Sequence, residues 1–222
     1  MTKIKEIFKS IQGEGRYIGY EQLFVRFCGC NLNCHYCDTD FDKNEVLGEF
    51  TPQALAEYVK SLDLTGIHSI SLTGGEPLLS YKFLKEFLPL TGQKIYLETN
   101  ATMYKELGEV IDFVDYIAAD IKLKSSTGVD GTFDMHDKFF EVTKGKDIFA
   151  KIVFGKNITE DEITQACELA NKYDLELILQ PQMNGDEMVV TSEFAEDILN
   201  KFLKKYSRTR LIPQVHKFLN VR

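Results

Sequence analysis

The sequence of 222 residues predicts an α/β protein, a partial (β/α) barrel of about six parallel strands with few covering helices. Two observations lead to this class. Short apolar runs alternate along the chain with segments whose apolar residues recur at helical spacing, which is typical of parallel strands joined by right-handed crossovers. Only about six such strand–helix units fit in this length, so an open barrel is favoured over a complete eight-fold one.

The first part of the chain is expected to form two strands around a loop. Residues 3–11 alternate between apolar and polar as a half-buried strand does, and the glycines of 12–15 break that pattern. Residues 21–27 are a second expected strand, which leads into a cysteine-rich loop. Further strands are expected at 68–73, 95–99, 116–120, 148–154, 175–179 and 210–215.

Helices are expected between these strands. Thr51 followed by Pro52 is typical of a helix start, and so is the capping box of Thr159 and Glu162. No internal repeat or linker interrupts the pattern, so 1–222 is interpreted as one domain with an N-terminal strand and loop (1–20) and a C-terminal tail (213–222). The expected helices lie near 51–62, 80–88, 102–111, 135–143, 159–170 and 192–206.

Composition and charge exclude several classes of protein. The net charge of −8 argues against a broad nucleic-acid-binding surface, which needs an excess of Lys and Arg. No apolar run approaches a membrane span, and the first residues lack the apolar segment of a signal peptide. Four of the five cysteines lie within 28–37, too close together for a disulfide framework, so a reducing, cytoplasmic location is expected.

The spacing of Cys30, Cys34 and Cys37 is C-x3-C-x2-C. Three thiolates can hold a soft metal centre. A cubane iron–sulfur cluster has four irons, so three cysteines leave one iron open for another ligand, whereas a closed structural site takes four ligands. The spacing therefore indicates a reactive [4Fe–4S] cluster. A structural zinc site completed by Cys28 or His35 is the alternative.

Several polar motifs stand where expected strands end. In parallel α/β folds the functional site lies at the carboxyl ends of the strands, so these motifs are expected to line one common site there. For Glu98, two roles fit equally well: a residue of this site, or a residue that only caps the end of its strand. The motifs are Thr73–Pro77, Glu98–Asn100, Asp120–Lys122 and Gln180–Gln182.

Together, the three cysteines and Gly74-Gly75-Glu76-Pro77 at the end of the next strand resemble the radical S-adenosylmethionine (SAM) superfamily. Four further matches narrow the resemblance to the 7-carboxy-7-deazaguanine synthase family, and the likeness runs from about residue 4 to the C-terminus. These matches are Ser10–Gly15, Arg26, Cys37-Asp38-Thr39 and the ending Ile212–Leu219.

This resemblance implies a TIM-like partial barrel of the radical SAM type and a lyase of queuosine biosynthesis. The implied reaction contracts 6-carboxy-5,6,7,8-tetrahydropterin to 7-carboxy-7-deazaguanine and releases ammonia. The implied cofactors are a [4Fe–4S] cluster on the three cysteines, SAM on the open iron, and Mg²⁺. A 5′-deoxyadenosyl radical from SAM does the chemistry, so no side chain is expected to be catalytic. A flavodoxin-like reductant and a homodimer are also implied.

The resemblance also assigns site residues, and their chemistry suits the roles. Arg26 offers a fixed fork for a substrate carboxylate, and Gln12 and Glu14 suit the amide and amino edge of a pterin. Thr39 supplies a hard oxygen for Mg²⁺. The implied substrate contacts are Ile11, Gln12, Gly13, Glu14, Arg26, Thr73, His216 and Arg222. The implied SAM contacts are Tyr36, Cys37, Asp38, Gly75, Glu76, Asp120, Ile121, Lys122, Gln180, Pro181, Gln182 and Met183.

Some of these assignments have alternatives that the sequence leaves open. Many members of the family read Ser-Pro-Lys where this chain has Asp120-Ile121-Lys122, which leaves the SAM contact of Asp120 undecided. His216 fits a structural role as well as a substrate contact, and His68 and His136 are expected at the surface. A glycyl-radical-enzyme activase shares the cysteine spacing and is the rival enzyme, and a zinc-binding interaction module is the rival that is not an enzyme.

Overall fold

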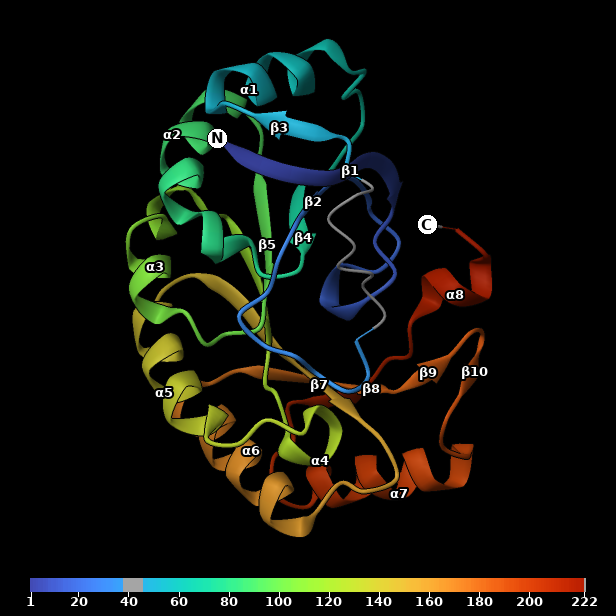
Figure 1. Cartoon of the computed structure of the whole chain (residues 1–222). Coiled ribbons are helices and arrows are strands. Elements are labelled where there is room, and N and C mark those ends of the chain that lie inside the picture. The colour runs from blue at the N-terminus through green and yellow to red at the C-terminus, as the bar shows by residue number, and fades with distance from the viewer. Residues whose placement is uncertain (38–45, 222) are drawn as a thin grey trace.

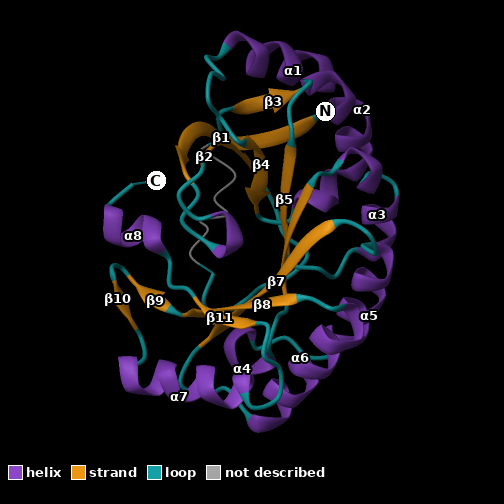
Figure 2. Cartoon of the chain, turned by 180° about the vertical axis from the view of Figure 1, so that it is seen from behind, coloured by secondary structure: helices purple, strands orange, loops and turns teal. Residues whose placement is uncertain are grey.

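The computed structural model describes residues 1–37 and 46–221, which form a curved sheet with helices along its outer side (Figures 1 and 2). Nine of the described strands make one sheet in the order β11-β8-β7-β6-β5-β4-β2-β1-β3. Their bounds are β1 Thr2–Ile11, β2 Glu21–Phe27, β3 Gly48–Phe50, β4 Ser69–Gly74, β5 Ile95–Thr99, β6 Tyr116–Asp120, β7 Asp147–Phe154, β8 Glu176–Pro181 and β11 Thr209–Leu211.

From β2 to β11 every neighbouring pair of strands is parallel, as the alternation of apolar patterns predicts. β1 is antiparallel to β2 and to β3, so the sheet ends there in an antiparallel edge. β3 and β11 are the two edges and do not pair with each other, which makes the barrel partial. A separate hairpin, β9 (Met183–Asn184) with β10 (Glu187–Met188), follows β8.

Every parallel crossover contains at least one helix. Threonine caps hold three helix starts: Thr51 accepts a hydrogen bond from Ala54 N, Thr191 accepts one from Phe194 N, and Thr159 forms the expected capping box with Glu162. The helices are α1 Pro52–Ser61, α2 Tyr81–Thr91, α3 Tyr104–Gly108, α4 Lys124–Thr127, α5 Thr132–Val142, α6 Glu160–Tyr173, α7 Ser192–Leu203 and α8 Val215–Leu219.

The C-terminal part differs from the expectation. β11 ends at Leu211 rather than 215, because Pro213 has no N–H to continue the ladder. The chain then crosses to the open side of the barrel, where α8 forms a helix that the sequence pattern did not indicate (Figure 2). In the described part of the chain, no helix is long and apolar enough to cross a membrane.

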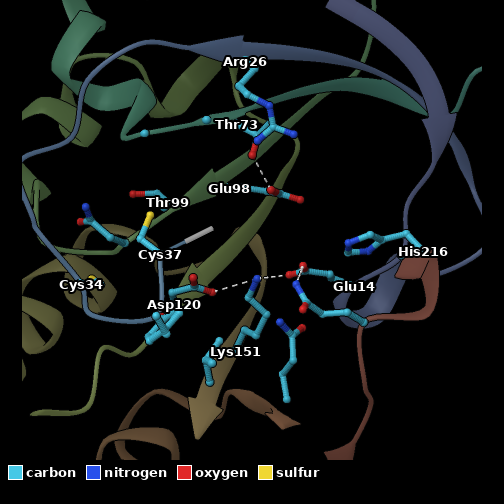
Figure 3. Close-up of a pocket in the computed structure, with 18 of the residues that line it drawn as sticks. Glu14, Arg26, Cys34, Cys37, Thr73, Glu98, Thr99, Asp120, Lys151 and His216 are labelled. Carbon is cyan, nitrogen blue, oxygen red and sulfur yellow. Dashed lines mark hydrogen bonds and ion pairs between the residues drawn. The ribbon is translucent and has the colours of Figure 1, made fainter. Parts of the chain in front are cut away.

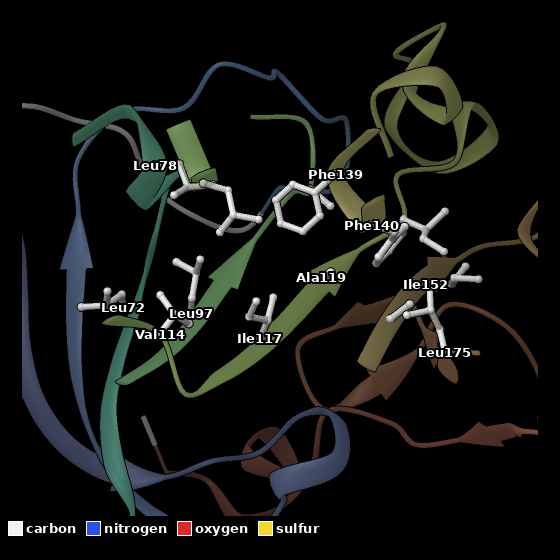
Figure 4. Packing of buried hydrophobic residues seen from close by; sticks show 14 of the residues in the cluster. Leu72, Leu78, Leu97, Val114, Ile117, Ala119, Phe139, Phe140, Ile152 and Leu175 are labelled. Carbon is white, nitrogen blue, oxygen red and sulfur yellow. The ribbon is translucent and has the colours of Figure 1, made fainter. Parts of the chain in front are cut away.

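The main core lies between the outer face of the sheet and the helices (Figure 4). Leu72, Leu97 and Ile117 from neighbouring strands are fully buried there, together with Phe139 and Phe140 of α5. Alternate residues of the same strands point to the inner face. Tyr96, Ala118, Phe149 and Ile178 make a second, smaller apolar cluster there, with Tyr17 packed against it. We call this inner cluster the floor of the barrel.

Candidate active site

A cavity of about 250 Å³ lies inside the barrel beyond the floor, toward the carboxyl ends of the strands. Most of the site residues expected from the sequence line it, although they come from separate segments of the chain (Figure 3). These are Ile11, Gln12, Gly13, Glu14, Arg26, Cys30, Cys34, Tyr36, Cys37, Thr73, Gly75, Asp120, Lys122, Gln180, Gln182, Met183 and His216.

A few expected residues lie elsewhere. Glu76, Ile121 and Pro181 are buried and do not line the cavity. Asp38, Thr39 and Arg222, which the resemblance assigns to SAM, Mg²⁺ and substrate, lie outside the described residues.

The three cysteines of the motif line one side of the cavity, and Figure 3 shows Cys34 and Cys37 across it from Glu14 and His216. Two N–H donors lie near the sulfur of Cys30, Leu32 N at 3.4 Å and Asn100 Nδ2 at 3.8 Å.

Cys28 and His35, the alternative zinc ligands, do not line the cavity, and the His35 ring packs against Gly128. Within residues 1–37 and 46–221, no three His, Cys, Asp or Glu side chains surround a single ion. Three thiols spread along one wall, with donors for sulfur beside them, are a donor set that fits an iron–sulfur cluster.

The glycine pair at the end of β4 fixes the cysteine loop against the sheet. Gly75 N donates to Phe27 O at 3.1 Å, and Glu76 N donates to Gly29 O at 2.8 Å. A Cβ on Gly75 would overlap the Gly29 carbonyl, and Gly74 has φ +119°, which only glycine adopts readily. Two glycines are therefore required for the start of the cysteine loop to lie this close.

Glu76 is an internal anchor whose carboxylate accepts from Leu78 N, Thr99 Oγ1 and Asn100 N at 2.8 to 3.1 Å. Burial raises the pKa of Glu76 to about 7, although these hydrogen bonds favour the charged form. Its side chain joins the ends of β4 and β5 beneath the cysteine loop.

His136 was expected at the surface, and this expectation was wrong because α5 turns its side chain inward, where it is fully buried. Its Nε2 accepts from Lys122 N at 2.9 Å, and its Nδ1 lies 3.0 Å from Ala101 O. Burial lowers the pKa of His136 to about 4. The neutral ring thus ties together the loops after β5 and β6.

A chain of charged side chains crosses the cavity, and Lys151 of β7 is its centre (Figure 3). Lys151 Nζ forms an ion pair with Glu14 and lies 3.3 Å from Asp120 Oδ1. The other oxygen of Asp120 is 2.7 Å from Lys122 Nζ, which also donates to Tyr36 OH at 2.9 Å. Lys151 was not predicted as a site residue from the sequence. The signal that could have indicated it is a charged residue inside an apolar strand.

The charged side chains of this series stabilise one another's charged forms. Burial favours neutral Glu14, but Lys151, Gln214 and His216 outweigh it and lower the pKa of Glu14 to about 2. Burial likewise opposes the charge of Lys151, yet Asp120 and Glu14 hold its pKa well above the usual value. Both groups are therefore charged at neutral pH.

A second hydrogen-bonded set surrounds Glu98. Its carboxylate accepts from Gln12 Nε2 at 2.9 Å and from Thr73 Oγ1 at 2.6 Å. Gln12 Nε2 also donates to the buried Gln22 side chain at 3.0 Å. Glu98 lines the cavity, so the structure places it at the site and not merely at a strand end.

Arg26 lies above Thr73 in Figure 3 and is fixed from the strand side. Its Nε is 2.7 Å from Glu6 Oε1, and its guanidinium carbon lies 5.8 Å from the centre of the Phe8 ring. These contacts orient the plane of the guanidinium at the cavity wall.

The C-terminal tail closes the open side of the cavity against the loop after β1. Val215 N donates to Gly13 O at 2.8 Å, and Gln214 Nε2 donates to Glu14 Oε1 at 2.6 Å. A Cβ on Gly13 would overlap His216, so the close approach that this glycine permits is to the tail.

The fold and the site together define a radical SAM protein, and comparison with known proteins agrees. The family model described as the Radical SAM superfamily matches residues 24–195. The chain also resembles the crystal structure of QueE from Escherichia coli, with a TM-score of 0.66 over 97% of this chain and 94% of that one, at 19% identity. A radical SAM methyltransferase from Sphaerobacter thermophilus gives a TM-score of 0.62 at 10% identity, covering 93% and 77%.

Sequence relatives identify the family within this class. The 7-carboxy-7-deazaguanine synthase of Geobacter sulfurreducens is 37% identical, and that of Archaeoglobus fulgidus 38%, each over 98% of this chain and 97% of the relative. The chain belongs to the 7-carboxy-7-deazaguanine synthase family of the radical SAM superfamily. This match decides against the activase that the cysteine spacing left open.

Proposed function

We propose that this protein contracts 6-carboxy-5,6,7,8-tetrahydropterin to 7-carboxy-7-deazaguanine with release of ammonia, a step of queuosine and deazapurine biosynthesis. The observation that carries the proposal is the two-sided cavity. Thiols line one side, and a fixed guanidinium and acid–amide pairs line the other, in a chain that matches these synthases along 98% of its length.

The cysteine side is the cofactor side. Cys30, Cys34 and Cys37 would hold the [4Fe–4S] cluster. When bound, the cluster and SAM supply a 5′-deoxyadenosyl radical that removes a hydrogen atom from the substrate. Tyr36, Lys122 and Asp120 form a hydrogen-bonded wall beside the cysteines, which suits the polar groups of SAM.

The opposite side suits the pterin. Arg26 binds the substrate carboxylate through two parallel hydrogen bonds, a role supported by the contacts with Glu6 and Phe8 that fix its plane. Glu14 and Glu98 are half-buried acceptors for the N–H groups along a pterin edge, and Gln12 and Thr73 hold Glu98 in place. The tail residues Gln214 and His216 shield this end from water.

We also propose the finer features that the resemblance implies. Mg²⁺ assists the reaction, with Thr39 as its protein ligand. A flavodoxin-like protein donates the electron, the chain acts as a homodimer, and it works in the cytoplasm.

The test is anaerobic incubation of reconstituted, reduced protein with SAM and 6-carboxytetrahydropterin, followed by mass spectrometry of the products. We expect 7-carboxy-7-deazaguanine, and the variant Cys34→Ala should form none. If the wild-type protein binds iron and cleaves SAM yet forms no deazapurine, the proposed substrate is wrong.

A further inference from the structure

Lys151 is the one strand-interior lysine among the described residues that reaches the cavity, and it is almost completely buried. It stands on the inner face of β7, two residues after Phe149 of the floor. A lysine in such a place is costly unless several partners compensate its charge.

Those partners come from both ends of the cavity. Glu14, in the loop after β1, is bound through its other oxygen to Gln214 of the tail. Asp120, at the end of β6, is bound through its other oxygen to Lys122, which continues to Tyr36 of the cysteine loop. Lys151 is the link at which these two halves meet.

The link is electrostatic, because the ammonium group of Lys151 balances the charges of both carboxylates. Without the ammonium group, the half-buried carboxylates of Glu14 and Asp120 would lose the cation between them, and each would be driven to move or to become neutral. A ligand that forms a hydrogen bond or an ion pair with either carboxylate therefore changes how strongly Lys151 binds the other carboxylate.

We propose that Lys151 is a positioning residue that couples the two ends of the cavity, so that binding of SAM and binding of the pterin strengthen each other. The inference rests on the proposed function, because Glu14 is assigned there to the pterin end and Asp120 to the SAM end. Lys151 sets the orientation of both carboxylates and takes no part in the radical chemistry.

The experiment measures dissociation constants by anaerobic equilibrium dialysis, for SAM and for the carboxypterin, each alone and in the presence of the other. In Lys151→Met, which keeps most of the length of the side chain, we expect both constants to rise by at least about tenfold, because the ion pairs of the buried ammonium group are lost. The factor by which one ligand improves the binding of the other should fall toward one. Unchanged constants and an unchanged factor would overturn the proposal.

Two further variants separate coupling from a general structural role. Lys151→Arg keeps the charge and should restore part of both affinities, whereas failure to restore either in folded, iron-loaded protein would count against the charge link. Lys172→Met is the matched control, since Lys172 forms an exposed ion pair with Asp137 outside the cavity and should leave every constant unchanged.

The double variant Lys151→Met/Glu14→Gln covers the case in which Lys151→Met does not fold. It removes the carboxylate at the pterin end and leaves Asp120 paired with Lys122, so SAM affinity should recover while pterin affinity stays weak. Equal loss at both ends would contradict the proposed link. If the wild-type protein binds no carboxypterin, the proposed function fails instead, and the SAM constants alone still decide whether Lys151 orients Asp120.

Discussion

The inner face of the barrel carries two layers that differ in character although the same strands supply both. One layer is the apolar floor, made of Tyr96, Ala118, Phe149 and Ile178. The residues two positions later on each of these strands, Glu98, Asp120, Lys151 and Gln180, line the cavity. Together with the other polar residues that line it, among them Glu14, Arg26 and Thr73, they form what we call the mouth. A step of two residues keeps a side chain on the same face of a strand.

Depth along the strand, and not the strand itself, therefore decides what a residue does. Floor residues contribute stability by burying apolar surface. Mouth residues exist in a costly environment and are balanced by one another, so their changes should appear first in ligand binding.

The largest expected effect is on the floor. Phe149→Ala removes a fully buried ring against which Gly15 packs, and should lower the free energy of unfolding by about 3–5 kcal/mol. Urea unfolding of the protein measures this change. Below the unfolding transition, SAM affinity per folded molecule should stay close to that of the wild type, and a selective loss of SAM binding without destabilisation would break the division.

Arg26→Ala tests the mouth at its pterin end. Arg26 is half-buried and a bound substrate would cover its contact with the carboxylate, so its loss should cost at least about 2 kcal/mol and lower turnover of the carboxypterin at least about 30-fold. SAM affinity should remain, because the SAM end lies at the cysteine side of the cavity. Arg26→Lys keeps the charge without the fork and should recover only a part. Wild-type turnover in Arg26→Ala would rule out the carboxylate-binding role.

The division between floor and mouth was only partly visible in the sequence. The strand-end motifs were found because the carboxyl ends of parallel strands meet at one edge. Lys151 was not, because it lies in the middle of β7 while its register partner, Asp120, is the last residue of β6. Such stagger between strands depends on how the sheet closes, which no local pattern encodes. The contact of Gly13 with His216, across most of the chain, was invisible for the same reason.

Acid should expose the charge balance of the mouth. The pKa of Glu14 is about 2 in the folded protein against an ordinary value of 4.5, so its carboxylate stabilises the fold above about pH 4.5. That contribution is lost as the pH falls from about 4.5 to 2, and amounts to roughly 3 kcal/mol.

The check is the free energy of unfolding between pH 6 and pH 2.5, compared with Glu14→Gln. The variant cannot lose a carboxylate at position 14, so its stability should fall less steeply with acid. Identical slopes for the two proteins would show that Glu14 is not held in its charged form by Lys151.

The smallest expected effect comes from removing one of two hydroxyl groups that lie on the same face of β4. Thr73→Val removes the 2.6 Å hydrogen bond to Glu98 and should raise the KM for the carboxypterin by about two- to tenfold, since such a bond contributes about 0.5–1.5 kcal/mol. Ser71 stands two residues earlier, and its buried Oγ has no hydrogen-bond partner among the residues that the structure describes. Ser71→Ala should therefore leave KM unchanged and the fold equally or more stable. A larger effect on KM from Ser71→Ala than from Thr73→Val would mean that the boundary between floor and mouth on β4 lies below Ser71.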